Sequence, residues 1–419
     1  MQEIKPLKNL DATVRLPGSK SYTQRAMVIA ALAQGESTLR NVLVAEDTLY
    51  LKEALRALGA EIKENGDILI IQGTEGHIKC PEQVLFLGNN GTALRFLTTV
   101  AALGSGRFVL TGEPRLCERP VQPLLDALAA LGVQSHAELG CPPVTIKAKG
   151  LGSGRAAFAN IASSQYVSSL LICAPYAQGE VDICVSGPTV SKPYITMTIE
   201  AMHQFGVEVS QEGEGDYRVG GGQCYQGRTY LVEGDVSTAS YFFLAAALCG
   251  GKVQVLNINP RSLQGDIELL RIMETLGCRV TRGENCLELA GGKLTAGDYT
   301  FDMGDLPDMV PTLAVLAAFR EGCTKITNVA HLRIKESNRI AALVSEISRI
   351  GVRAEELPDG LVIWGGKPHG AEIETYNDHR LAMSFAIAGL AAPGMRIKNH
   401  QCVKKSFPAF WEELDKLYG

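Results

Sequence analysis

Cations stand at the predicted beginnings of several apolar helices, where packing residues or neutral caps would be expected. Lys20 and Arg25 belong to one such segment, with Arg25 four positions after Ser21 and therefore on the same helix face, and Arg380 belongs to another. The helix dipole repels a cation in the first helical turn, so a negative group should compensate for it. Unpaired N–H groups together with Lys or Arg form an anion site, which predicts a ligand that carries phosphate or carboxylate groups.

The same segments carry Ser, Thr, Asn or Asp, which are ordinary N-cap residues. They are Gly18–Ser21, Gly88–Thr92, Ser163–Gln165, Ser237–Ser240, Asp305–Asp308 and Asn377–Arg380. Capping alone accounts for any single one of them. One helix terminus contributes only about 0.3 to 1 kcal/mol to anion binding, so several must converge to hold a phosphate tightly.

Further charged residues lie outside these helix beginnings. In LRIKESNR, Lys335 and Arg339 are four positions apart on one helical face with Glu336 beside them, an arrangement that equally suits a surface ion pair. Carboxylates among cations, such as Asp308 and Glu336, are candidates for proton transfer because neighbouring charges move pKa values. Composition and spacing alone indicate an enzyme that acts on polyanionic small substrates.

An internal repeat predicts the elements that must position these residues. Amphipathic helices that end at a Gly before a strand recur at intervals of 71 to 74 residues, with glycines at Gly59, Gly132, Gly206, Gly277 and Gly351. A sixth such helix ends at Gly419. A second series of apolar, Ala-rich helices recurs between them, with turn glycines at Gly35, Gly106, Gly179, Gly251, Gly322 and Gly394. Glycine in these places suits the left-handed position after a helix. Six units of about 72 residues therefore account for the chain.

The polarity of the two helix series predicts which helices are buried and which lie at the surface. The second series is apolar nearly all round and belongs inside, whereas the first series has a charged outer face. The sixth copy has no strands after Gly419, and we expect the extended stretch from Ile4 to Leu16 to supply them. We therefore divide the chain into residues 1–19, which complete the first lobe, residues 20–234, which form the second lobe, and residues 235–419, which form the rest of the first lobe.

Composition excludes several classes of function. The chain has 419 residues with Lys+Arg 40 and Asp+Glu 45, and it lacks a long basic run, which argues against nucleic-acid binding. The longest strongly apolar run, Tyr241–Cys249, is too short to span a bilayer, and we expect a cytoplasmic protein. Its 11 cysteines form no C-x-x-C and its 7 histidines no H-x-x-x-H, so we expect packing cysteines and no metal.

Ten short motifs in a fixed order make the sequence similar to a known family. They are LPGSKS with Arg25, GNNGTALRF, GEPRLCERP, SSQ, SKPY, EGDVSTASYF, LPDM, RIKESNR, YNDHR and the segment that begins at Lys405 with KSFP. Over essentially its full length the chain closely resembles the 5-enolpyruvylshikimate-3-phosphate (EPSP) synthases, the enolpyruvyl transferases of the shikimate pathway. The resemblance implies an α/β fold, a two-lobed inverse α/β barrel built from six βαβαββ repeats with three in each lobe.

The resemblance also implies the reaction. The enolpyruvyl group of phosphoenolpyruvate is transferred to the 5-hydroxyl of shikimate 3-phosphate through a tetrahedral intermediate, and phosphate is released. The family needs no metal or organic cofactor, its substrates are these two small molecules, and we expect a monomer. Residues that the resemblance assigns to shikimate 3-phosphate are Lys20, Ser21, Arg25, Ser163, Ser164, Gln165, Ser191, Tyr194, Asp308, His331 and Lys335.

Phosphoenolpyruvate would be held by a second set of residues. This set comprises Lys20, Asn89, Gly91, Arg119, Gln165, Arg339, Arg380 and Lys405. In the family pattern Asp308 takes the 5-hydroxyl proton, and Glu336 with Lys20 donates a proton to the methylene carbon. Such positioned acids and bases supply about 10² to 10⁴ in rate.

Three positions depart from the family pattern. His331 stands where the pattern has Asn, Asn90 replaces a small Ala beside Gly91, and Phe96 replaces a Pro one turn behind. Asn and His both hydrogen-bond, so the resemblance does not fix the role of His331. Crowding near Gly91 bears on the fit of glyphosate, an inhibitor that competes with phosphoenolpyruvate in this family.

Two other functions compete with this interpretation. The related transferases that act on UDP-N-acetylglucosamine place a reactive Cys five residues before an Arg-Pro pair, and the corresponding residue here is Pro114. Cys117 is nearby but offset, which favours a bystander. A non-catalytic protein that binds anionic metabolites is the other alternative, and the presence of Asp308, Glu336 and Lys20 argues against it.

Overall fold

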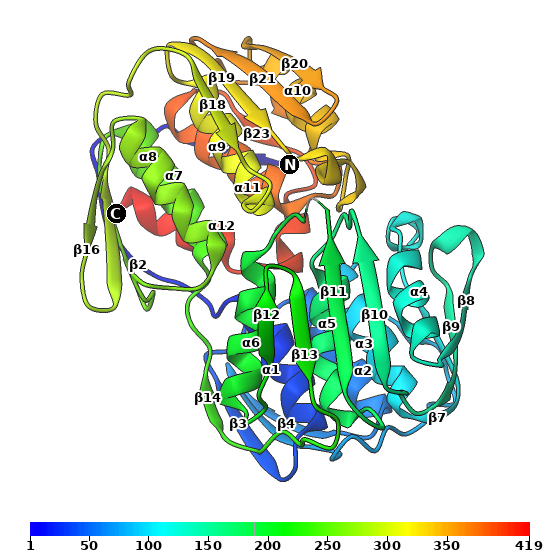
Figure 1. The fold of residues 1–419 in the computed structure, drawn as a ribbon. Helices are drawn as coiled ribbons and strands as arrows, with labels where there is room; N and C mark the ends of the chain where they lie inside the picture. The colour runs from blue at the N-terminus through cyan, green and yellow to red at the C-terminus, as the bar shows by residue number, and fades with distance from the viewer. Residues whose placement is uncertain (188) are drawn as a thin grey trace. The chain divides into compact units, whose positions relative to one another are not determined.

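The chain crosses twice between two folding units. The structure is a computed structural model that describes residues 1–187 and 189–419. Unit 1 comprises Met1–Pro17 and Glu233–Gly419, and unit 2 comprises Gly18–Val232 (Figure 1). The first and last residues of the chain therefore belong to the same unit, and each unit has its own hydrophobic core.

Unit 2 is built around three buried helices, which are the apolar helices of the repeat. They are α1 (Lys20–Leu32), α3 (Gly91–Leu103) and α5 (Gln165–Cys173). The amphipathic helices that alternate with them are α2 (Glu46–Ala57), α4 (Gln122–Ala130) and α6 (Pro193–Gln204). In α3 every residue except Thr92 and Leu103 is buried, so the helix has no solvent-exposed face.

Unit 1 repeats this plan. Its buried helices are α7 (Val236–Cys249), α9 (Val310–Ala318) and α11 (His379–Ala391). The other three are α8 (Leu269–Thr275), α10 (Arg339–Arg349) and α12 (Phe410–Asp415). In α10, Ile340, Leu343 and Ile347 are buried at spacings of three and four, which is the amphipathic pattern predicted for this series. Arg349 is exposed, whereas the charged residues Arg339 and Glu346 are buried.

Each repeat contributes to a small sheet, and five of the six sheets share one four-stranded topology. In unit 2 the strand orders are β14-β3-β5-β4, β6-β7-β9-β8 and β10-β11-β13-β12, and in unit 1 they are β16-β17-β15-β2, β18-β19-β21-β20 and β1-β23-β22. In the five four-stranded sheets one parallel pair is followed by two antiparallel pairings. The α/β fold and the six copies predicted from the sequence are confirmed.

The strands of unit 2 are short. Their bounds are β3 (Glu36–Arg40), β4 (Glu61–Asn65), β5 (Ile68–Gln72), β6 (Leu85–Phe86), β7 (Ser105–Thr111), β8 (Gln134–Ala137), β9 (Val144–Lys149), β10 (Gly154–Ala159), β11 (Val181–Ser186), β12 (Ser210–Gly213), β13 (Asp216–Val219) and β14 (Thr229–Leu231). Those of unit 1 are β1 (Gln2–Glu3), β2 (Leu10–Arg15), β15 (Gly251–Leu256), β16 (Arg279–Arg282), β17 (Cys286–Ala290), β18 (Tyr299–Asp302), β19 (Gly322–Thr327), β20 (Arg353–Leu357), β21 (Gly360–Gly365), β22 (Glu372–Ile373) and β23 (Arg396–Ile397).

Each of the two strands that precede a crossing pairs with a strand of its own unit that is distant in sequence. Strand β14 pairs in parallel with β3 at the other end of unit 2, and β2 pairs in parallel with β15 in unit 1. We expected the stretch from Ile4 to Leu16 to complete the sixth copy, and this expectation was wrong. Its strand β2 completes the fourth copy instead, while β1 at Gln2–Glu3 joins the sixth copy by pairing with β23.

Glycine is required where the chain crosses. A Cβ on Gly18 would lie 1.7 Å from the carbonyl oxygen of Asn41, and one on Gly234 would lie 2.6 Å from that of Asn257. Asn41 and Asn257 both have φ 56°, a left-handed conformation that Asn tolerates. The turn that follows a strand in each unit thus packs directly on the segment that leads into α1 or α7.

Candidate active site

Two carboxylates and two guanidinium groups form a compact cluster in unit 1. Asp308 lies in the 3₁₀ helix η5 (Pro307–Met309) before α9, and its Oδ1 accepts from Nη1 of Arg339 at 3.0 Å. Its other oxygen, Oδ2, accepts from Nη2 of Arg380 at 2.5 Å. Glu336 completes the cluster, since its Oε2 lies 2.8 Å from Nη2 of Arg339. Four predicted residues from three separate motifs therefore meet.

Asp378 fixes the geometry of this cluster. It is the N-cap of α11, where its Oδ1 accepts from the backbone N of Arg380 at 3.0 Å. Its Oδ2 accepts from Nε of Arg339 at 2.8 Å and from Oγ of Ser337 at 3.0 Å. Burial opposes the charge of Arg339, but the carboxylates of Asp378, Glu336 and Asp308 outweigh it and raise the pKa of Arg339 above its ordinary value. Arg339 is thus a permanent cation.

His331 and Lys335 lie near the cluster, and Lys405 lies buried in the same unit. His331 belongs to the 3₁₀ helix η6 (Ala330–Ile334), and its Nε2 has no hydrogen-bond partner among residues 1–187 and 189–419. Burial, and then the charge of Lys335, lowers the pKa of His331 to about 3, so the ring is neutral at ordinary pH. Lys405 ends the 3₁₀ helix η7 (His400–Lys405), which packs against α11.

In unit 2 a second cluster surrounds the beginning of α3. A Cβ on Gly91 would lie 2.7 Å from both Cζ and Nη2 of Arg119 and 2.5 Å from Nη1 of Arg95, so two guanidinium groups lie directly on this glycine. Nη1 of Arg95 donates to the carbonyl of Gly91 at 2.9 Å and to Oε1 of Gln165 at 3.1 Å. The predicted ligands Gly91, Arg119 and Gln165 are thus brought together.

Several predicted residues lie at the neighbouring helix beginnings. Nε2 of Gln165 donates to Oγ1 of Thr92 at 2.9 Å, and Ser163 and Ser164 directly precede α5. Asn89 directly precedes Asn90, the N-cap of α3. The Asn90 side chain caps Ala93 at 2.9 Å and donates to Oε1 of Gln24 at 2.8 Å. The Asn90 side chain, one of the three departures from the family pattern, therefore links α3 to α1.

Arg25 contacts two further predicted ligands of unit 2, Ser21 and Tyr194. Its Nη1 donates to the carbonyl of Ser21 at 3.0 Å, its Nη2 to that of Tyr194 at 3.0 Å and its Nε to Oγ1 of Thr198 at 2.8 Å. The guanidinium lies 5.4 Å from the ring centroid of Phe96, the other departure from the family pattern. Burial lowers the pKa of Arg25 to about 10, which still leaves it charged at neutral pH. Ser191 precedes α6 with φ 61°.

Lys20 lies at the first position of α1. Its Nζ is 3.3 Å from Oδ2 of Asp47, a buried carboxylate in the first turn of α2. The backbone carbonyl of Asp47 in turn accepts from Nδ2 of Asn90 at 2.7 Å. These contacts connect the predicted proton donor to the helix beginning that holds Gly91.

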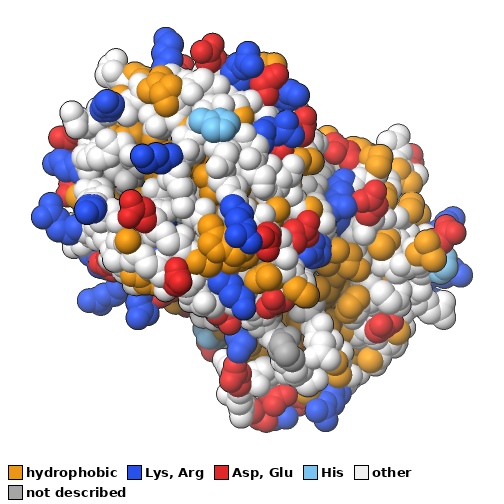
Figure 2. All heavy atoms as spheres, turned by 90° about the horizontal axis from the view of Figure 1, so that it is seen from above, with side chains coloured by type: hydrophobic (Ala, Val, Ile, Leu, Met, Phe, Trp, Pro, Cys, Tyr) orange, Lys and Arg blue, Asp and Glu red, His pale blue; other side chains and the backbone are white. Residues whose placement is uncertain are grey.

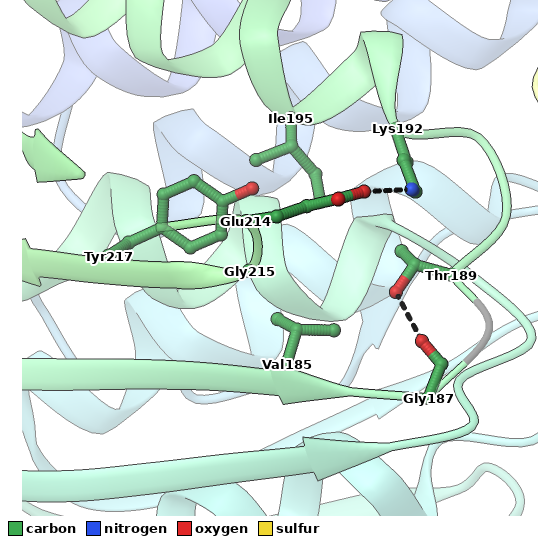
Figure 3. Close-up of a pocket in the computed structure, with 8 residues that line it drawn as sticks. All are labelled: Val185, Gly187, Thr189, Lys192, Ile195, Glu214, Gly215 and Tyr217. Atoms are coloured by element: carbon green, nitrogen blue, oxygen red, sulfur yellow. Dashed lines mark hydrogen bonds and ion pairs between the residues drawn. The ribbon is translucent and has the colours of Figure 1, made fainter. Parts of the chain in front are cut away.

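A cavity of about 300 Å³ lies at the end of the β10–β13 sheet in unit 2 (Figure 3). Its lining includes Lys192 and Tyr217, and Lys192 forms an ion pair with Glu214 across the opening. The cavity adjoins Ser191 and Tyr194 in sequence, but its lining contains none of the predicted ligands. We assign it no role in the reaction.

Two kinds of feature are absent from the described residues. Within residues 1–187 and 189–419, no group of three His, Cys, Asp or Glu side chains could hold a metal ion, and no helix is long and apolar enough to cross a membrane. On the face shown in Figure 2, cations and anions are interspersed over the part of the chain that the structure describes, unlike the basic stripe typical of nucleic-acid binding.

Sequence reasoning missed several residues that the structure places in these clusters. Asp378 and Arg95 were noted only as members of motifs, and their side-chain partners Arg339 and Gln165 lie in other motifs. Asp47, Thr198 and Tyr241 carry no local signal, because their partners lie far away in sequence. Nη1 of Arg380, for example, donates to the hydroxyl of Tyr241 at 3.3 Å.

Comparison with known proteins gives the family. The model of the EPSP synthase (3-phosphoshikimate 1-carboxyvinyltransferase) family matches residues 4–414. A 3-phosphoshikimate 1-carboxyvinyltransferase of Nostoc punctiforme is 44% identical over 412 residues, with 97% of this chain and 96% of that protein covered. One of Methanothermobacter thermautotrophicus is 43% identical over 411 residues, with 98% and 96% covered.

A solved structure agrees with these matches. The EPSP synthase of Acinetobacter baumannii superposes with a TM-score of 0.82 at 29% identity, over 99% of this chain and 97% of that one. The match extends over both units, and the two curated relatives are covered nearly from end to end. The chain therefore belongs to the EPSP synthase family, the 3-phosphoshikimate 1-carboxyvinyltransferases.

Proposed function

We propose that this enzyme transfers the enolpyruvyl group of phosphoenolpyruvate to the 5-hydroxyl of shikimate 3-phosphate and releases inorganic phosphate. The observation that carries the proposal is the cluster in which Asp308 and Glu336 are held by the buried guanidinium of Arg339, with Arg380 on Asp308. Two carboxylates in fixed positions suit a reaction that removes one proton and delivers another. The two cations suit an anionic substrate.

The reaction has two balanced steps. In the addition, the 5-hydroxyl oxygen bonds to C2 of phosphoenolpyruvate while Asp308 takes the hydroxyl proton and Glu336, with Lys20, supplies a proton to C3. In the elimination, the C2–O bond to phosphate breaks and a proton leaves the new methyl group. The product is an enol ether and the leaving group is phosphate, so no oxidant or reductant is consumed.

Cations are proposed to neutralise phosphoenolpyruvate. They are Lys20, Arg119, Arg339, Arg380 and Lys405. Phosphoenolpyruvate can approach the backbone at Gly91 because glycine has no side chain to block the beginning of α3. Shikimate 3-phosphate is assigned to the surroundings of Arg25, with His331 and Lys335 from unit 1. The other residues proposed to bind shikimate 3-phosphate are Ser21, Ser163, Ser164, Gln165, Ser191 and Tyr194. Asn89 is proposed to bind phosphoenolpyruvate.

Inorganic phosphate release provides the direct test. The purified protein is given phosphoenolpyruvate with either shikimate 3-phosphate or UDP-N-acetylglucosamine, and phosphate is followed in each mixture. Release only with shikimate 3-phosphate supports the proposal. Release with the nucleotide sugar would assign the related transferase activity instead, and no release with either would indicate a binding protein.

We also infer that the enzyme works in the cytoplasm as a monomer. The 11 cysteines form no disulfide in the described part of the chain, which suits a reducing compartment. Both sets of proposed ligands belong to one chain, so the proposal needs no second copy. Light scattering tests the second point, because a monomer should have a mass of 44.9 kDa.

A further inference from the structure

Glu346 is a buried acidic residue of α10 that the proposed reaction does not use. The residue is 0% exposed. Its Oε2 accepts a hydrogen bond from the backbone N of Glu374 at 3.0 Å, and its Oε1 accepts one from the hydroxyl of Tyr376 at 2.9 Å. Nε of Arg349 lies 3.0 Å from Oε2 and provides a compensating charge. Two of these three partners belong to one short segment between β22 and α11.

That segment, residues 374–377, has an unfavourable backbone conformation. Tyr376 has φ 52° and Asn377 has φ 54°, so two consecutive residues lie in the left-handed region. Asn tolerates this region, but a bulky residue such as Tyr rarely adopts it and stays there only where its surroundings hold it. The side chain of Asn377 accepts from Nδ2 of Asn399 at 3.0 Å, while the hydroxyl of Tyr376 donates to Glu346. Contacts of both side chains therefore support the conformation.

Two residues of the catalytic cluster follow this segment directly. The backbone N of Asp378 donates to the carbonyl of Thr375 at 2.8 Å, so the segment leads straight into the N-cap of α11. If the backbone of the segment changed, Asp378 would move relative to Arg339, with which it forms an ion pair at 2.8 Å. Arg380 would move relative to Asp308. The conformation of the segment therefore decides whether the cluster assembles.

Helix α10 holds this stretch of the chain at two points. Arg339 and Glu346 are seven residues apart, which is about two helical turns and places them on the same face of the helix. Arg339 contacts Asp378, which follows the left-handed residues. Glu346 contacts Glu374 and Tyr376, which lie before and within them. A segment that is attached on both sides of its strained residues keeps one orientation relative to the helix.

We propose that Glu346 is a positioning residue for Asp378 and Arg380, because it holds the left-handed turn that precedes α11. It acts through the backbone of Glu374 and the hydroxyl of Tyr376, and none of its described contacts is with a proposed substrate ligand. The inference rests on the assignment of Arg380 to phosphoenolpyruvate in the proposed function. Loss of the Glu346 contacts should weaken the binding of phosphoenolpyruvate more than that of shikimate 3-phosphate, whose proposed ligands belong mostly to unit 2.

The test is the Michaelis constant for each substrate in two variants of Glu346, measured by phosphate release. Glu346→Leu keeps the approximate volume but leaves the N–H of Glu374 and the hydroxyl of Tyr376 without this acceptor. The constant for phosphoenolpyruvate should rise at least about tenfold, whereas that for shikimate 3-phosphate should stay within about twofold. Glu346→Gln can still accept from Glu374 and can donate its amide N–H to the Tyr376 hydroxyl, so it should restore most of the affinity for phosphoenolpyruvate.

A further variant keeps the inference open to refutation if Glu346→Leu does not fold. Tyr376→Phe removes the hydroxyl that Glu346 holds and keeps the ring, and the Michaelis constant for phosphoenolpyruvate should rise by roughly three- to tenfold. Tyr418→Phe is the matched control, because the Tyr418 hydroxyl also makes a hydrogen bond within unit 1, to the carbonyl of Lys5 at 2.7 Å. It should leave both Michaelis constants unchanged.

The outcomes separate this inference from the proposed function. A wild type that releases no phosphate would overturn the function, and the inference with it. An active wild type whose Glu346→Leu and Tyr376→Phe variants unfold at lower temperature, with an unchanged ratio of the two Michaelis constants, would show a purely structural role and overturn the inference alone. An equal loss of affinity for phosphoenolpyruvate in Glu346→Gln and Glu346→Leu would also overturn it, because the charge of Glu346 would then matter rather than its contacts with the turn.

Discussion

Asp308 and Arg380 are joined by the shortest charged contact that we describe in the catalytic cluster, with 2.5 Å between Oδ2 and Nη2. Arg339 holds the other oxygen of the same carboxylate at 3.0 Å. Two guanidinium groups stabilise the ionised carboxylate, which is the form that accepts a proton. The pair thus keeps the proposed base ionised and places a cation beside it.

Replacing the proposed base tests this arrangement. Asp308→Asn keeps the volume but cannot accept the 5-hydroxyl proton, so the turnover number should fall at least about a hundredfold. Steady-state kinetics give the loss, and thermal unfolding shows whether the fold survives. Asp11→Asn, at an exposed carboxylate of unit 1, is the control and should keep normal turnover. Near-normal turnover of Asp308→Asn would remove Asp308 as the base.

Gly91 tests the guanidinium cluster of unit 2. In Gly91→Ala, the new methyl group would lie 2.5 Å from Nη1 of Arg95 and 2.7 Å from Arg119, so at least one cation must move. We expect the Michaelis constant for phosphoenolpyruvate to rise about tenfold or more, since one displaced charged hydrogen bond is worth about 1.5 to 3 kcal/mol.

The matched control is Gly366→Ala, because a Cβ on Gly366 meets nothing within 4 Å. It should leave both Michaelis constants unchanged. If Gly91→Ala bound phosphoenolpyruvate as the wild type does, the cluster around α3 would not hold this substrate.

Arg25 tests the assignment of the other substrate. Arg25→Lys keeps the charge but cannot reproduce the forked contacts to Tyr194, Thr198 and Ser21. The Michaelis constant for shikimate 3-phosphate should rise at least about tenfold while that for phosphoenolpyruvate changes little. Arg107→Lys, at an exposed position of β7, is the control. Equal increases for both substrates would argue that Arg25 supports unit 2 as a whole.

Local patterns were enough to predict the repeat, because each copy encodes its own helix ends. All six first-series glycines have positive φ, from 80° at Gly132 to 109° at Gly59, as expected after a helix. In the second series Gly179 is the exception, since it follows the short 3₁₀ helix Ala174–Tyr176 rather than a helix end of the same kind. Local patterns could not say which sheet β2 joins, because Leu10–Arg15 would fit any parallel edge.

Local sequence patterns also predicted only part of the candidate active site. The motifs supplied the charged residues, since a cation at a helix beginning is visible in one stretch of sequence. They did not supply Asp47, which is an ordinary acidic residue until tertiary structure buries it beside Lys20. The resemblance to a family filled part of this gap for ligands, but it gave no reason for the orientation of Asn90, which depends on Gln24.

The neutral ring of His331 predicts how stability depends on pH. Burial, and then Lys335, lowers its pKa to about 3 in the folded protein, whereas the unfolded chain should bind a proton near pH 6.5. As the pH falls below 6.5, the unfolded state takes up a proton that the folded state does not, so the free energy of unfolding decreases. The limiting slope is about 1.4 kcal/mol per pH unit.

His331→Asn isolates this contribution, because Asn does not titrate and the other acidic and basic groups are common to both proteins. Urea unfolding at pH 7.5, 6.5 and 5.5 gives the difference in the free energy of unfolding between the wild type and the variant. From pH 6.5 to 5.5 this difference should shift by about 1 kcal/mol in favour of the variant. A difference that is the same at all three pH values would mean that His331 keeps an ordinary pKa when folded, and that its ring gains a proton, and with it a positive charge, at mildly acidic pH beside Lys335.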